Sequence, residues 1–219
     1  MKINFIIYYI ILFIALLLSV TRIRHDKKLL VFSVLLACTL FQELLGGYLE
    51  YKKAGSHIFF IYHIFAPLYY ALFAAYFSST MPYGKARSLV RLSIPFFIVL
   101  SICISFWQQS LLVFPGVQLN IMSILLIAAS MAVLFQLDVR DRTPLFRRPV
   151  FWISISTMFF YAALFSLDGF VNYLEAHNPK LGNDLTLFLN LNLNYLYYLL
   201  IIIGMLCSKP RMKYSLQSY

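Results

Sequence analysis

The sequence predicts an all-α membrane protein: a bundle of seven transmembrane helices with its N-terminus outside and its C-terminus in the cytoplasm. The 219-residue chain is 62% hydrophobic and only 12% charged, with a mean hydropathy of +0.80. About a quarter of the residues of a soluble protein are charged. The apolar runs reach the roughly 20 residues that a helix needs to cross a bilayer. Lysine and arginine lie mainly between these runs and favour one side.

Seven apolar runs of spanning length follow one another, separated by short polar breaks. Breaks such as "MPYGKAR" (81–87) and "FPGV" (114–117) contain the proline and glycine typical of turns. Because all loops are short, we expect residues 1–219 to form a single transmembrane domain. The expected helices lie at approximately 3–20, 29–49, 58–79, 92–108, 118–136, 150–173 and 186–206.

The first run could instead be a cleaved signal peptide, because Lys2 precedes an apolar stretch. That stretch is longer than the apolar core of a signal peptide, and no A-x-A-like cleavage site follows it. The cluster "TRIRHDKK" (21–28) directly after the run suits the cytoplasmic end of a membrane helix. We therefore expect the first run to remain as a helix.

The last run contains "LFLNLNLNYLYYLLIII" (187–203), whose middle alternates between apolar and polar residues as a half-buried strand does. Its length suits a spanning helix, and an open strand cannot cross a bilayer. We therefore predict a helix. At 100° per residue, Asn190 and Asn194 share one face, whereas Asn192 points elsewhere and must bond across another contact or to its own backbone.

The net charge of +10 indicates membrane topology rather than nucleic-acid binding, because the basic residues flank apolar runs. One side of the predicted bundle holds only Lys2, Lys52, Lys53 and Lys180. The positive-inside rule makes the richer side cytoplasmic. That side holds Arg22, Arg24, Lys27, Lys28, Lys85, Arg87, Arg91, Arg140, Arg142, Arg147, Arg148, Lys209, Arg211 and Lys213.

Polar residues of the second and third helices suggest a site in the outer half of the bundle. Glu43 shares a face with Gly46 and Gly47, which would let a neighbouring helix approach the carboxylate closely. His63 and Tyr70 share a face of the third helix with Pro67. Pro67 cannot donate to the carbonyl of His63, so we expect a kink and a free carbonyl there, although such kinks are common in membrane helices.

The sixth helix carries a longer polar stripe that includes Tyr161 and Asp168, and the seventh carries Asn190 and Asn194. These side chains could simply bond across helices, and Asp168 could lie among the lipid headgroups. The sharper hypothesis is an outward-facing, ligand-binding polar pocket. Its predicted residues are Glu43, His63, Tyr70, Tyr161, Asp168, Asn190 and Asn194.

The sequence indicates no cofactor. A retinal protein needs a Schiff-base lysine in its last helix, and residues 186–206 contain none. A metal site of Glu43, His57, His63 and Asp168 is conceivable, but its spacing is not diagnostic. His63 and Asp168 could form an acid/base pair, although no recognisable nucleophile accompanies them.

The stretches "ELLGGYLEYKKAG" (43–55), "RRPVFWISISTMFFYAALF" (147–165) and "LNLNYLYYLLIIIGMLC" (191–207) resemble small seven-pass proteins of the bacterial inner membrane. Similar membrane regions accompany two-component histidine kinases. The resemblance implies a location in the bacterial cytoplasmic membrane and a role in sensing or accessory signalling. It also implies a separate signalling partner, such as a histidine kinase, because this sequence contains no kinase signature.

We therefore expect a non-enzymatic sensor or accessory subunit in the lipid bilayer. A ligand or proton from outside would change helix packing at the cytoplasmic loops around 21–28, 80–91 and 137–149. Two alternatives remain at this stage. The polar stripes could line the path of a small transporter or channel, or His63 and the acids could serve an intramembrane enzyme that acts on lipid.

Overall fold

The computed structural model describes the backbone of residues 2–52, 55–107, 111–137, 144–177 and 179–207. Side chains are described for the same residues except 2–3, 55–58, 168–177, 179–184 and 187. The described chain is helical throughout, apart from the connections between helices. It forms α1 (Lys2–Arg22), α2 (Leu29–Tyr51), α3 (Gly55–Thr80), α4 (Lys85–Trp107), α5 (Gly116–Gln136), the 3-10 turn η1 (Leu145–Arg147), α6 (Pro149–His177) and α7 (Pro179–Cys207).

All seven α-helices contain a segment long and apolar enough to cross a membrane. The prediction of an all-α bundle of seven spanning helices is therefore confirmed, and a lipid bilayer is the environment that these helices suit. Residues 187–203 lie within α7, so the alternation of asparagine with apolar residues belongs to a helix. In such a helix every backbone amide within the span can bond to its own chain.

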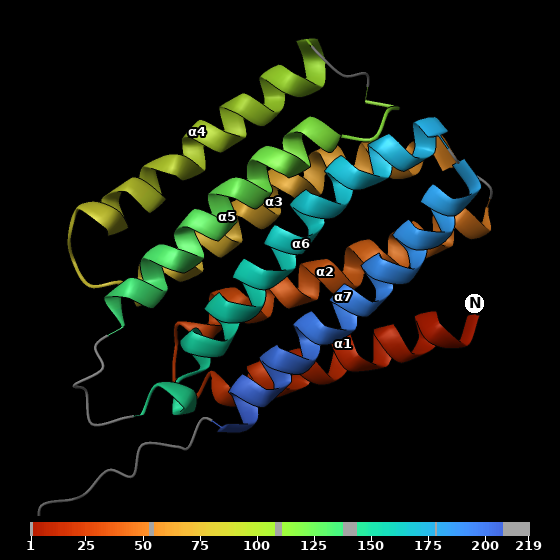
Figure 1. Ribbon diagram of the computed structural model, residues 1–219. Helices are drawn as coiled ribbons and strands as arrows, with labels where there is room; N and C mark the ends of the chain where they lie inside the picture. Colours follow the sequence, from red (N-terminus) through yellow and green to blue (C-terminus); the bar gives the residue numbers. More distant parts are fainter. Residues whose placement is uncertain (1, 53–54, 108–110, 138–143, 178, 208–219) are drawn as a thin grey trace, which may run out of the picture.

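The helices run alternately up and down (Figure 1), and the contacts between them place six of the seven in a ring. Around this ring α1 packs on α2, α2 on α3, α3 on α5, α5 on α6, α6 on α7, and α7 again on α1. The remaining helix, α4, lies outside the ring against α3 and α5. The ring therefore encloses an interior to which α4 does not contribute.

The helices extend beyond the predicted runs, most clearly at the starts of α4 and α7 and at the end of α6. The expected helices at 92–108, 150–173 and 186–206 correspond to α4, α6 and α7, which start at Lys85, Pro149 and Pro179. A helix can continue beyond its apolar run because long polar side chains at its end can reach water. At the start of α4, the Arg87 guanidinium packs on the preceding connection, over the ring of Tyr83 and 4.1 Å from its centroid.

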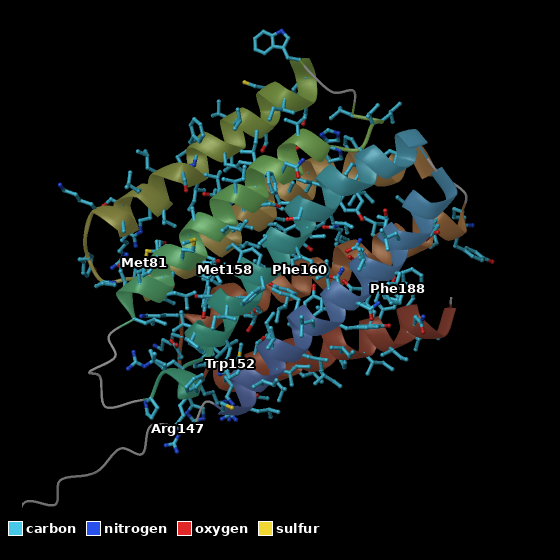
Figure 2. All side chains as sticks on the ribbon, in the orientation of Figure 1. Met81, Arg147, Trp152, Met158, Phe160 and Phe188 are labelled. Atoms are coloured by element: carbon cyan, nitrogen blue, oxygen red, sulfur yellow. The ribbon has the colours of Figure 1, made fainter. Side chains whose placement is uncertain are left out.

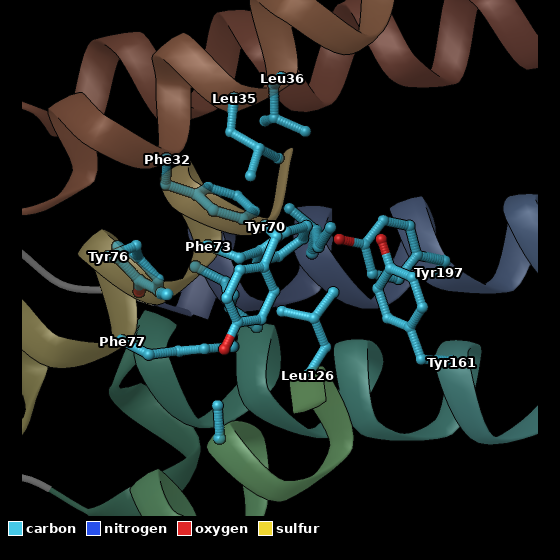
Figure 3. Packing of buried hydrophobic residues seen from close by; sticks show 14 of the residues in the cluster. Phe32, Leu35, Leu36, Tyr70, Phe73, Tyr76, Phe77, Leu126, Tyr161 and Tyr197 are labelled. Atoms are coloured by element: carbon cyan, nitrogen blue, oxygen red, sulfur yellow. The ribbon is translucent and has the colours of Figure 1, made fainter. Parts of the chain in front are cut away.

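Large aromatic side chains fill the middle of the bundle and the half opposite the start of α1. Phe32, Phe73, Tyr76 and Phe77 are each at most 2% exposed. The rings of Phe32 and Tyr76 lie 5.2 Å apart, and those of Phe73 and Phe77 lie 5.9 Å apart. Figure 3 shows Tyr76 and Phe77 on one side of this cluster and Tyr161 and Tyr197 on the other. The interior is thus packed at this end of the ring.

α6 and α7 approach each other closely near the same end. A Cβ atom added to Gly204 would lie 2.5 Å from the Cβ of Trp152. The indole Nε1 of Trp152 donates a hydrogen bond of 2.8 Å to the carbonyl of Phe146 in η1. Trp152 and Arg147 lie close together at this end in Figure 2. Gly204 therefore sets how closely α7 approaches Trp152, and through it the turn that carries Arg147.

Substituting Gly204 tests this close approach. We expect Gly204→Ala to lower the free energy of unfolding by about 1–3 kcal/mol, because the added methyl overlaps the rigid Cβ of Trp152. Gly46→Ala is the matched control, since nothing lies within 4 Å of a Cβ at that helical position. Thermal unfolding in detergent should give a Tm several degrees lower for Gly204→Ala alone. Equal Tm values for both variants would contradict the predicted overlap.

Candidate functional site

Two adjoining hollows occupy the interior of the ring, in the half where α1 begins. The outer hollow has a volume of about 290 Å³ and is lined by α1, α2, α3 and α7. The inner hollow has a volume of about 230 Å³ and is lined by all six helices of the ring. Six residues line both: Tyr8, Gln42, Glu43, Tyr62, Asn190 and Asn194. The two hollows thus adjoin each other, and we call them together the central hollow.

The central hollow starts near the end of the bundle and stops at its aromatic core. Its outer part is lined by Phe5 and Glu50, both of which are exposed. Its inner part reaches Leu35 and Phe73. Phe73 belongs to the buried aromatic cluster described above. The central hollow therefore lies between the exposed end of the bundle and its aromatic core.

Four of the seven predicted site residues line the central hollow. Glu43, Asn190 and Asn194 line both of its parts, and Tyr161 lines the inner part. They come from α2 and from the consecutive helices α6 and α7, which are distant in sequence from α2. The helical faces derived from sequence thus meet in the interior of the ring for these four residues.

The two glycines beside Glu43 have different surroundings. A Cβ on Gly47 would lie 3.2 Å from the hydroxyl oxygen of Tyr9, so α1 approaches α2 closely there. The same hydroxyl donates a hydrogen bond of 3.4 Å to the backbone carbonyl of Glu43. Gly46 lines the outer hollow and has nothing within 4 Å of a Cβ position. Gly47 therefore permits helix packing, whereas Gly46 leaves space beside the carboxylate.

The three asparagines of α7 divide as their helical positions predict. The amide nitrogen of Asn194 donates to the backbone and side-chain oxygens of Asn190, each at 2.9 Å. The amide nitrogen of Asn192 donates to the carbonyl of Phe188, one turn earlier, at 2.7 Å. The prediction that Asn192 bonds elsewhere, here to its own helix backbone, is confirmed. Asn190 and Asn194 instead present polar groups to the central hollow.

His63 does not line the central hollow, because both of its ring nitrogens have partners towards α4. Its Nε2 lies 3.0 Å from the carbonyl oxygen of Val113, and its Nδ1 lies 2.8 Å from the hydroxyl of Ser105. A carbonyl can only accept, so Nε2 carries the proton of that bond. In the neutral ring, Nδ1 then accepts from Ser105. His63 thus holds α3 to α4 and to the connection that follows α4.

The carbonyl of His63 also has a partner. Pro67 lies within α3 and has no N–H to donate to this carbonyl. Instead the side-chain nitrogen of Gln118 in α5 donates to it over 3.5 Å, and Gln118 is fully buried. The carbonyl that Pro67 leaves free in α3 is therefore bonded between helices.

Tyr70 and Asp168 complete the predicted set. The hydroxyl of Tyr70 lies 2.5 Å from that of Ser93 in α4, and the Tyr70 ring lies 4.6 Å from that of Phe97. Like His63, Tyr70 holds α4 against α3 and does not line the central hollow. The side chain of Asp168 lies outside the described residues. Within the described part of the chain, no three His, Cys, Asp or Glu residues lie close enough together to hold a metal ion.

Several residues of the hollow were not predicted, among them Tyr8, Gln42, Tyr62 and Tyr69. Gln42 precedes Glu43 directly, and its side chain is only 7% exposed. The carbonyl oxygen of its amide has no hydrogen-bond partner among the described residues. A glutamine within a spanning run was an available signal, since polar groups at membrane depth rarely face lipid. The tyrosines gave no such signal, because aromatic residues are abundant throughout the chain.

Comparison of the chain with models of protein families, with curated proteins and with solved structures found no match. The resemblance to seven-pass inner-membrane proteins therefore remains a prediction, whereas the described chain does contain seven helices long and apolar enough to cross a membrane. The function must accordingly be argued from the geometry of the central hollow and of the contacts that join it to the opposite end.

A double-mutant cycle tests the bond between Gln118 and the carbonyl of His63. Replacing Pro67 with alanine restores an N–H that can bond to this carbonyl within α3. We expect Gln118→Leu to destabilise the native chain more than it destabilises the Pro67→Ala variant, by on the order of 0.6 kcal/mol, the mean for polar contacts in membrane bundles. Unfolding in mixed micelles measures both values. Strict additivity of the two substitutions would show that Gln118 stabilises the bundle in some other way.

Proposed function

We propose that the chain is a non-enzymatic sensor or accessory signalling subunit of the bacterial cytoplasmic membrane, and that it binds its ligand in the central hollow. The supporting observation is a pair of adjoining hollows inside a ring of six helices, lined by polar groups near the end of the bundle and bounded by a packed aromatic core. A site of this form suits binding with a conformational response.

In this proposal the end where α1 begins faces outwards. Because the helices alternate in direction, the basic residues of the α1–α2 and α3–α4 connections lie at the opposite end, together with Arg147 and Arg148. The positive-inside rule assigns that end to the cytoplasm. The ligand would then enter from outside, and any protein partner would bind at the basic end.

One helix joins the two ends. α7 carries Asn190 and Asn194 in the hollow, and ten residues beyond Asn194 it carries Gly204 against Trp152. A helix of this length moves as a rigid element, so a ligand that displaces the asparagines also displaces Gly204. Trp152 in turn bonds to Phe146 in η1. Ligand binding would thus alter the turn next to Arg147 and Arg148, where a histidine kinase could read the change.

The alternative function as a small transporter would need a path through the aromatic half of the ring. Phe32, Tyr76 and Phe77 fill that half and are at most 1% exposed. Opening a path would require all three large rings to move. The packing of the described residues therefore favours ligand binding over transport.

Cysteine labelling tests both the hollow and its orientation. With Cys38, Cys103 and Cys207 replaced, we expect Gly46→Cys to react with a membrane-impermeant maleimide added to intact cells. Gly84→Cys, at the opposite end, should react only after lysis. Both glycines have open space at their Cβ positions. Ser130→Cys is the buried control, because Ser130 is 0% exposed. If Gly46→Cys reacts no faster than Ser130→Cys, the hollow does not admit water.

Photo-crosslinking tests the partner. A photoreactive phenylalanine analogue at position 146 should form an adduct with a histidine kinase in native membranes, because Phe146 is 63% exposed beside Arg147. Position 159 is the matched control, since Phe159 is 59% exposed within a spanning helix and should contact lipid. Mass spectrometry identifies the adducts. The signalling proposal fails if position 146 yields no kinase adduct, or if purified protein alone carries solute across liposome membranes.

A further inference from the structure

We infer that the ligand of the central hollow is a protonated organic amine, recognised by the Glu43 carboxylate, by the aromatic walls and by the amide carbonyl of Gln42. This inference rests on the proposed ligand-binding role and adds the chemical class of the ligand. Three features of the hollow carry it: the sign of its charge, the nature of its walls and an unpaired acceptor.

The charged side chains that line the hollow are all acidic. Glu43 lines both parts and Glu50 lines the outer part, whereas the lining of the described hollow includes no lysine, arginine or histidine. His63 in α3 is basic, but its ring does not line the hollow, and both ring nitrogens contact other partners, Ser105 and Val113. A carboxylate at membrane depth is costly unless a positive charge accompanies it. The walls supply none, so a cationic ligand would complete the site.

The walls are suited to a cation that carries apolar groups. Nine of the twenty residues that line the inner part are tyrosine or phenylalanine. Their rings adjoin one another: the centroids of Tyr8 and Tyr198 are 5.9 Å apart, and those of Tyr197 and Tyr198 are 4.9 Å apart. The faces of such rings attract ammonium groups and contact carbon atoms equally well. Strongly hydrated inorganic ions would gain far less from these walls.

Gln42 indicates that the cation bears N–H groups. It lines both parts of the hollow beside Glu43, and the carbonyl oxygen of its amide has no partner among the described residues. Because this oxygen is buried and not open to the hollow, the amide would rotate on binding to accept a hydrogen bond from the ligand. A protonated amine can donate to Glu43 and Gln42 together, whereas a quaternary ammonium cannot. The hollow therefore fits an amine with a small apolar body.

The ammonium group could belong to a free amine or to the ethanolamine headgroup of a phospholipid. Both present the same charge and the same N–H donors to Glu43 and Gln42. The sources differ in where they come from, since a headgroup would enter from the surrounding lipid. The test therefore varies the lipid and the soluble amine separately.

The Gly46→Cys chain, with its native cysteines replaced, reports binding in nanodiscs of phosphatidylglycerol. The rate of maleimide labelling is measured with benzylamine, phenethylamine and adamantylamine. Phenethyl alcohol, phenylpropionate and phenethyltrimethylammonium are the neutral, anionic and quaternary controls. We expect at least one amine to slow labelling about tenfold or more at saturation, because it fills the space beside Gly46. The neutral and anionic controls should leave the rate unchanged, and the quaternary control should protect less than phenethylamine.

Variants of the Glu43 carboxylate and of the aromatic wall show which residues of the hollow recognise the amine. Glu43→Gln should weaken protection by at least about tenfold, as expected for loss of a charge-assisted bond. Asp26→Asn, which removes an exposed carboxylate at the opposite end, should leave protection unchanged. Tyr198→Phe keeps a ring face and should retain protection, whereas Tyr198→Leu should weaken it severalfold. Size exclusion and the labelling rate without ligand show that each variant is folded.

The outcomes separate this inference from the proposed function. If Gly46→Cys is not labelled even without ligand, the proposed function fails. If it is labelled but no amine protects it, if the alcohol protects as well as the amine, or if protection survives in Glu43→Gln, the amine inference is overturned and the hollow remains. Equal protection by the quaternary compound overturns the assignment of an N–H donor. Slow labelling without added amine, seen only when nanodiscs contain phosphatidylethanolamine, would identify the headgroup as the source.

Discussion

The structure depends on one constraint: within a bilayer, each polar group must find its partner inside the protein. Hydroxyl groups meet this constraint locally by donating to the preceding turn, as Ser123 and Ser130 do over 2.8 and 2.7 Å. Asn192 does the same with its amide. Side chains that cannot be satisfied within their own helix then determine which helices pack together.

Two groups of polar contacts follow from this constraint, and they have different roles. The first group joins α4 to α3 through His63 and Ser105 and through Tyr70 and Ser93. These contacts are complete, so they stabilise packing. The second group surrounds the central hollow, where the amide carbonyl of Gln42 has no hydrogen-bond partner among the described residues.

Sequence periodicity accounts for much of this arrangement but not for the neighbours of each helix. The spans of all seven helices could be derived from length and hydropathy, and the shared faces of Asn190 and Asn194 followed from helical geometry. The partners of His63 could not be derived, because a helical projection shows which residues share a face and not which helix covers that face. Nothing in the apolar run of α4 indicates that it lies outside the ring. The interior position of Tyr8 was equally hidden, since its surroundings depend on contact between α1 and α7.

That contact has a consequence for biogenesis. The ring closes only where the last helix meets the first, and the hydroxyl of Tyr195 bonds to the carbonyl of Asn4 across nearly the whole length of the chain. During synthesis, α1 and α2 enter the membrane long before α7 exists, so Glu43 spends this interval without the wall that carries Asn190 and Asn194. Assembly of the hollow consequently waits for the insertion of α7. A chain whose synthesis stops before α7 leaves an acidic side chain open to lipid, a defect that membrane quality control can recognise.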